Sequence, residues 1–140
     1  MKKPNLNIKF YTNKIRNNTN ISQVFKAYLN RGILYFKNKC YKKATEDFIY
    51  AIEISSTKGC YREMLKSYSI TYREYNYIIA KYFFLRGLAY IKIKNLDKGI
   101  DDFNKALDLD SKVIQDNKLE LNILPLEIIG LIRSFFDIEI

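Results

Sequence analysis

The 140-residue sequence has no histidine and no tryptophan, and it has only two cysteines and two prolines. Without histidine, the chain lacks the commonest general base and the commonest metal ligand. The two cysteines, Cys40 and Cys60, are too few for a disulfide framework or, by themselves, for a zinc site. We therefore expect a protein without catalytic residues, metal or cofactor.

Long apolar runs are also missing. No stretch approaches the roughly 18 consecutive apolar residues of a membrane-spanning helix. The N-terminus, MKKPNLNIKFYTNKIR, starts basic like a secretory signal, but asparagine and lysine interrupt any apolar segment. These features predict a cytoplasmic protein with no membrane span.

Acidic residues are absent from the first third of the chain, since the first one is Glu46. Residues 1–45 carry eleven Lys or Arg, whereas residues 46–140 carry thirteen against fifteen acids, so the whole net charge of +9 comes from the first third. Such asymmetry favours an acidic partner, a nucleic acid or another anionic surface bound through residues 1–45, or it is simply a solvated basic arm. Residues 1–20, rich in Asn and Lys, have a composition that allows disorder.

An internal repeat organises the rest of the sequence. Residues 25–56 align without a gap on residues 80–111, and eleven of the 32 positions are identical. Within each copy, two segments carry apolar residues at spacings of three and four, separated by a short polar turn. Each copy is therefore predicted to be a helix–turn–helix hairpin, and the fold class is all-α.

The repeated pattern resembles the tetratricopeptide repeat family, whose 34-residue unit has six characteristic large or small positions. The resemblance covers residues 25–58 and 80–113. It departs from the family where serine replaces the usual proline at Ser56 and Ser111, and where Gly99 replaces alanine. The first copy has Tyr28, Gly32, Tyr35, Ala44, Phe48 and Ala51 at these positions, and the second has Phe83, Gly87, Tyr90, Gly99, Phe103 and Ala106.

Glycine occupies the same place in both copies, at Gly32 and Gly87, in the interior of a predicted helix. Glycine there costs about 1 kcal/mol relative to alanine. We expect the two helices of a hairpin to cross closest at this point, so that a side chain would push them apart. Two acidic pairs, Glu46–Asp47 and Asp101–Asp102, recur on the second helix of each copy, where we expect them to lie on a solvated face.

Residues 59–79 form an insertion between the two units. Its tyrosines continue at helical spacing into the second unit, which favours one extended helix over residues 61–93. The alternative is a break at "SITY" (69–72), since Thr71 and Glu74 have the spacing of a capping box. Helical spacing also favours packing of these tyrosines over stacking on nucleic-acid bases.

Residues 114–140 are expected to form a C-terminal apolar helix that starts near Pro125. One interpretation is a cap over the open face of the second unit; the other is an association surface, most simply of a homodimer, that includes Phe135 and Phe136. The domain organisation predicted is thus a basic arm (1–20), a repeat domain (21–113) and this helix.

The resemblance implies a non-enzymatic scaffold that binds a peptide or helix in a concave groove lined by the first helix of each unit. Carried over position by position, both copies place apolar residues between two lysines, which would suit a partner with acidic flanks. The alternative is that the insertion or the C-terminal helix fills this groove as core. The implied groove residues are Lys26, Leu29, Ile33, Phe36 and Lys37 in the first unit, and Lys81, Phe84, Leu88, Ile91 and Lys92 in the second.

Overall fold

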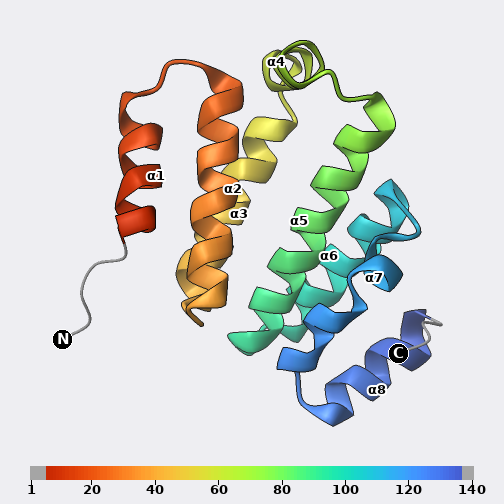
Figure 1. The fold of residues 1–140 in the computed structure, drawn as a ribbon. Helices are drawn as coiled ribbons and strands as arrows, with labels where there is room; N and C mark the ends of the chain where they lie inside the picture. Colours follow the sequence, from red (N-terminus) through yellow and green to blue (C-terminus); the bar gives the residue numbers. More distant parts are fainter. Residues whose placement is uncertain (1–5, 137–140) are drawn as a thin grey trace. The chain divides into compact units, whose positions relative to one another are not determined.

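The computed structural model describes residues 6–136, which form eight α-helices and one short 3₁₀ helix, with no strand in that range (Figure 1). The fold is all-α, as predicted. The helices are α1 (Leu6–Asn17), α2 (Ile21–Lys37), α3 (Tyr41–Ser55), α4 (Lys58–Tyr68), α5 (Tyr72–Lys92), α6 (Leu96–Leu109), α7 (Val113–Asp116), η1 (Lys118–Ile123) and α8 (Leu126–Phe136).

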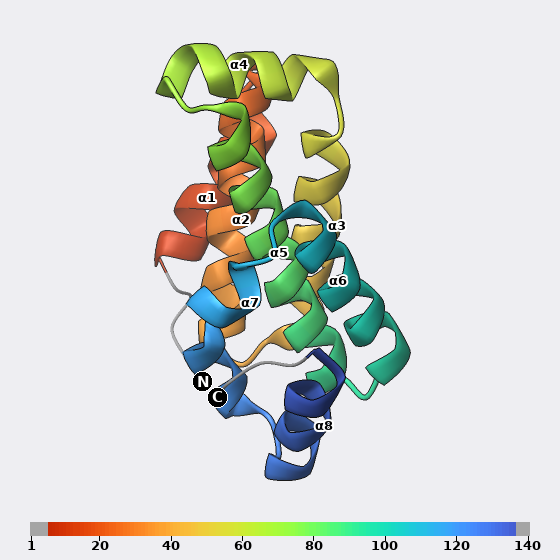
Figure 2. The same cartoon turned by 90° about the vertical axis from the view of Figure 1, so that its right-hand side faces the viewer.

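The chain divides into two compact units, and the boundary between Tyr75 and Asn76 falls inside α5. In the first unit, α2 packs against α1, α3 and α4. In the second, the rest of α5 forms a hairpin with α6, followed by α7, η1 and α8 (Figure 2).

Helices α2 and α3 approach each other closely at Gly32, as the sequence predicts. A Cβ atom placed on Gly32 would lie 2.6 Å from Cε1 of Phe48, whose side chain is fully buried. In the α5–α6 hairpin, a Cβ on Gly87 would lie 2.8 Å from Cε1 of Phe103 and 3.0 Å from the carbonyl oxygen of Gly99. Both glycines therefore allow a backbone approach that any side chain would obstruct.

The turns of the two hairpins share an unusual backbone conformation. Lys39 (φ 63°) and Lys94 (φ 70°) both adopt the left-handed region, which lets the chain reverse after α2 and α5. Asn95 then caps α6, because its side chain accepts a hydrogen bond from the amide of Lys98 at 3.3 Å.

The expectation of one helix over residues 61–93 was wrong. α4 ends at Tyr68, Ser69 adopts a left-handed conformation (φ 51°), and α5 begins at Tyr72. The alternative capping box is present: the amide of Glu74 donates to Oγ1 of Thr71 at 3.1 Å, and the Glu74 carboxylate accepts from the Thr71 amide at 3.4 Å. A left-handed residue followed by a new cap stops one helix and starts the next.

The N-terminal arm is not disordered over residues 6–17, which form α1 against α2. Four of its five half-buried residues, Ile8, Tyr11, Thr12 and Ile15, recur at spacings of three and four, so the helix has an inner face despite its polar composition. Residues 1–5 lie outside the described part of the chain.

The C-terminal segment is not a single helix over residues 114–136, and residues 137–140 lie outside the described part of the chain. The apolar helix proper is α8, which starts after Pro125 as expected, while residues 113–123 form the short α7 and η1. α8 buries Ile129 and Ile132, and the ring of Phe136 meets that of Phe103 at 5.8 Å. This face of α8 therefore caps the second unit.

Candidate functional site

The predicted groove residues of the first unit all lie on α2, but most of their apolar surface is internal. Leu29 and Phe36 are buried, Lys26 and Ile33 are half-buried, and only Lys37 is exposed. The accessible part of this face therefore consists of Ile33 and the two lysines, Lys26 and Lys37.

Contacts at both ends of α2 account for part of this burial. The ring of Phe36 meets the ring of Tyr41 on α3 edge-on at 5.4 Å, so Phe36 is part of the hairpin interior. At the other end of α2, the ammonium of Lys26 lies 4.0 Å over the ring of Tyr68, and the hydroxyl of Tyr68 accepts a hydrogen bond from the Gln23 side chain at 2.8 Å. Tyr68 of the insertion therefore covers the Lys26 end of this face.

The corresponding face of α5 is also largely internal. Phe84 packs on Phe103 with ring centroids 5.4 Å apart, and Cγ1 of Ile91 lies 2.5 Å from where a Cβ on Gly99 would be. These side chains therefore fill the α5–α6 interface rather than an open surface. Of the five predicted residues, Phe84, Leu88 and Ile91 are buried, whereas Lys81 and Lys92 are half-buried.

Lys92 has a defined partner within the second unit. Its ammonium donates a hydrogen bond to the carbonyl oxygen of Ile123 at 3.1 Å, so the end of η1 lies beside this lysine. The repeat pattern identified Lys92 by its position, but it contained no signal for this contact because residues 114–125 do not match the repeat.

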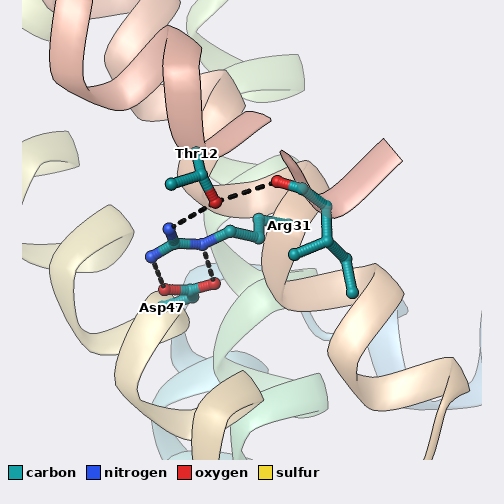
Figure 3. A network of polar contacts seen from close by, with 4 residues as sticks. Thr12, Arg31 and Asp47 are labelled. Atoms are coloured by element: carbon teal, nitrogen blue, oxygen red, sulfur yellow. Dashed lines mark hydrogen bonds and ion pairs between the residues drawn. The ribbon is translucent and has the colours of Figure 1, made fainter. Parts of the chain in front are cut away.

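The acidic residues Asp47 and Asp102 do not lie on a solvated face, contrary to the sequence-based expectation. Asp47 is buried, and its two carboxylate oxygens accept hydrogen bonds from Nε and Nη2 of Arg31 at 2.8 and 2.7 Å (Figure 3). Nη1 of Arg31 also donates to Oγ1 of Thr12 at 3.1 Å, which ties α1 to the hairpin. Only the other member of each pair, Glu46 and Asp101, is exposed.

The second hairpin repeats this ion pair. Nε and Nη2 of Arg86 donate to the carboxylate of Asp102, both at 2.8 Å. In each hairpin the guanidinium also lies near the rings of two aromatic residues of its own helix. These are Tyr28 and Tyr35 around Arg31, and Phe83 and Tyr90 around Arg86, at 5.2 to 5.9 Å. The repeated pair is thus a bidentate, largely buried clamp between the two helices of each hairpin.

Two neighbouring buried groups of the first unit, Cys60 and Tyr75, have shifted pKa values. Burial raises the pKa of the Cys60 thiol, whereas a reactive cysteine has a lowered pKa. Burial, together with the neighbouring Cys60, also raises the pKa of Tyr75, whose hydroxyl donates to the carbonyl oxygen of Ser55 at 2.7 Å. Among the described residues, no group of three His, Cys, Asp or Glu side chains could hold a metal ion.

The tyrosines of the insertion pack on one another. Tyr61 meets Tyr72 at 5.7 Å and Tyr75 at 5.3 Å, both edge-on, and Tyr75 in turn lies 6.5 Å from Phe25. Tyr75 is buried, whereas Tyr72 remains 62% exposed. The helical spacing of these residues therefore reflects packing, as the sequence favoured.

These features define a class: a protein built from antiparallel helix pairs that cross at a glycine and are clamped by an Arg–Asp pair. Residues 80–113, which include the second part of α5 and all of α6, match the model of the tetratricopeptide repeat family. The match does not extend to the first hairpin, which shares the glycine crossing and the ion pair. No curated protein and no solved structure matches the chain.

A tetratricopeptide repeat is typical of modules for protein–protein interaction. Within residues 6–136, no helix is both long enough and apolar enough to cross a bilayer.

Proposed function

We propose that the protein is a non-enzymatic module that binds a peptide or helix of another protein through the first helix of each hairpin. The observation that carries this proposal is the tetratricopeptide repeat at residues 80–113. The geometry of residues 25–58 supports treating the first hairpin as a second repeat, because the Arg31–Asp47 pair has the same two-bond arrangement as Arg86–Asp102.

The accessible groups on these helices favour a partner with acidic flanks. On α2, Ile33 and Lys37 reach the surface, and on α5 the lysines Lys81 and Lys92 are partly accessible. The buried apolar residues of these two helices do not themselves supply contact area. Lysine ammonium groups would attract Asp and Glu side chains on either side of an apolar segment.

The unbalanced charge of the first third strengthens this expectation. Arg31 is neutralised by Asp47, but residues 1–45 contain no acid of their own. The exposed cations of the described part of this third are therefore compensated only by groups from later in the chain or by a partner. They are Lys9, Arg16, Lys37, Lys39, Lys42 and Lys43.

The test is selection of peptides from a random display library on the full chain, followed by binding measurements with charge-reversal variants. Lys37→Glu combined with Lys81→Glu should abolish binding of the selected peptides. The matched control combines Lys42→Glu with Lys105→Glu, which reverses two exposed charges on α3 and α6, the second helices. We expect selected sequences with Asp or Glu around an apolar centre; peptides that bind both double variants equally would exclude these faces.

A nucleic acid is the competing partner class, and salt dependence separates the two. Binding of a generic RNA oligonucleotide that falls steeply between low and moderate salt would assign the basic third to nucleic-acid recognition. We expect RNA binding to be weak at moderate salt, because lysine rather than arginine supplies most of the charge and the tyrosines are engaged in packing.

A further inference from the structure

Helix α4 is held to the first unit by few side chains. It lies across the ends of α2 and α3, both of which it contacts (Figure 2). Its buried residues are Cys60 and Met64, whereas the hairpin helix α3 buries six residues. Segments with few buried side chains open more easily than the rest of a domain, so α4 is the part of the first hairpin region best suited to move.

Breaks in the helical backbone separate α4 from the helices on either side. Before α4, the side chain of Thr57 accepts a hydrogen bond from the amide of Cys60 at 3.2 Å and so starts a new helix. After α4, Ser69 adopts its left-handed conformation, and the Thr71–Glu74 capping box starts α5. Because α4 and α5 each begin with their own cap, α4 can move as one piece without unwinding its neighbours.

The last residue of α4, Tyr68, covers a lysine of the α2 face. The ammonium of Lys26 lies 4.0 Å from the centroid of the Tyr68 ring, and the Tyr68 hydroxyl accepts a hydrogen bond from the Gln23 side chain at 2.8 Å. A cation–π contact engages the same ammonium group that would attract a carboxylate. Tyr68 therefore lies where an acidic side chain of a partner would bind Lys26.

We propose that α4 is a lid on the α2 face. In the closed state, Tyr68 engages Lys26; in the open state, α4 moves off α2 and Lys26 becomes available to an acidic side chain of the partner. The role of the lid rests on the proposed peptide binding, but its movement does not. Opening also separates the ring of Tyr61 from that of Tyr75, 5.3 Å away, so the open state is a minor population, and a partner that requires it binds more weakly by that fraction.

Thiol labelling tests the movement, because Cys60 is fully buried on α4. In a Cys40→Ser variant, Cys60 is the sole cysteine, and its reaction with a chromogenic disulfide reagent reports opening. The matched reporter combines Cys40→Ser and Cys60→Ala with Ala51→Cys, which places one thiol at a fully buried position of α3. We expect Cys60 to react at least about tenfold faster than this introduced thiol.

The urea dependence of labelling provides a second measurement, which holds even where the introduced thiol loosens α3. The Cys60 rate should change little at low urea concentrations, since a local opening exposes less surface than global unfolding. A Cys60 rate that rises with urea as steeply as global unfolding, or that equals the rate of the thiol in α3, would mean that α4 opens only when the whole unit unfolds. Either result would overturn the proposal.

Tyr68→Ala tests whether Tyr68 holds the lid closed. Loss of its cation–π contact and of its hydrogen bond with Gln23 should raise the rate of Cys60 labelling about tenfold. The control is Tyr50→Ala, which removes a 52% exposed tyrosine of α3 and should leave this rate unchanged. A Tyr68→Ala variant that is labelled no faster than its parent would contradict the assignment.

The strongest-binding peptide from the display selection tests the role of the lid. Tyr68→Ala should bind this peptide more tightly by the same factor by which labelling accelerates, since both quantities report the open fraction. Lys26→Met in the Tyr68→Ala background should cancel the gain, whereas Lys42→Met, at an exposed position of α3, should preserve it. Faster labelling with unchanged affinity would refute Lys26 as the covered binding group. A selection that returns no peptide would count against the proposed function alone, because the labelling rates decide the movement independently.

Discussion

Substitution of Gly87 by alanine tests whether the hairpin depends on a backbone crossing at this residue. The new Cβ would lie 2.8 Å from Cε1 of Phe103 and 3.0 Å from the carbonyl oxygen of Gly99. Phe103 is fully buried, and the second neighbour is backbone, so neither can move aside without displacing α6. The substitution therefore forces the two helices of the repeat apart.

The expected magnitude comes from two opposing effects. Alanine favours the helix over glycine by about 0.4–1 kcal/mol, chiefly because it restricts the unfolded chain. Overpacking of a well-filled core costs about 1–3 kcal/mol. The net loss for Gly87→Ala is therefore about 1–2 kcal/mol, and a larger side chain, as in Gly87→Leu, should cost more.

Urea denaturation followed by circular dichroism measures this loss. The matched control is Gly59→Ala, in the first turn of α4, where a Cβ would meet only Cδ1 of Ile21 at 4.0 Å. We expect the control to be as stable as the unmodified chain or up to about 1 kcal/mol more stable. If Gly87→Ala were also neutral or stabilising, the close crossing could not be what selects glycine at this position.

Three further perturbations have expected outcomes. Arg31→Ala leaves the buried carboxylate of Asp47 without its partner and should lower the free energy of unfolding by about 3 kcal/mol, measured in urea. Lys94→Gly should raise it by about 0.5–1 kcal/mol in the same assay, because glycine adopts φ 70° without strain. Burial raises the pKa of Tyr75 and raises that of Tyr82 to about 12, so the folded state keeps these protons after the unfolded state has lost them. Thermal stability should therefore fall above pH 10. In melting curves measured at different pH values, Tyr75→Phe should make this fall less steep.

For each of these three predictions, a specific result would contradict the reasoning. An Arg31→Ala variant as stable as the unmodified chain would mean that the Asp47 carboxylate is solvated. Loss of stability in Lys94→Gly would show that the lysine side chain matters more than the backbone conformation. An alkaline profile unchanged by Tyr75→Phe would assign the pH dependence to other tyrosines.

The two hairpins were predictable from the sequence because the same residue pattern occurs twice, so that each copy supports the interpretation of the other. Gly32 and Gly87 are unusual helix residues, and their recurrence at the same place predicted the crossing that the structure contains. Asp47 shows the limit of this argument. Its identity in both copies was visible, but an acidic residue beside a charged neighbour suggests a solvated face unless its partner, Arg31 on another helix, is recognised.

Periodicity also failed to report where helices end. The tyrosine spacing continues from residue 61 to residue 82 because most of these side chains pack against others on both sides of the break, whereas the backbone is interrupted by the left-handed Ser69 and the Thr71–Glu74 capping box. For the predicted groove residues, the repeat positions identified a helix face but not which side chains cover it, since Tyr68 and Ile123 come from segments outside the repeat. Coverage depends on tertiary packing, which a repeat position does not encode.

The clamps Arg31–Asp47 and Arg86–Asp102 each join residues that are 16 apart in sequence. Closing such a short segment costs little chain entropy, and folds dominated by local contacts form quickly. During synthesis, α2 and α3 are made before α5 and α6, so the first hairpin can form before the second. We expect its apolar surface to be covered early, so that little of it remains open to aggregation while the second hairpin is completed.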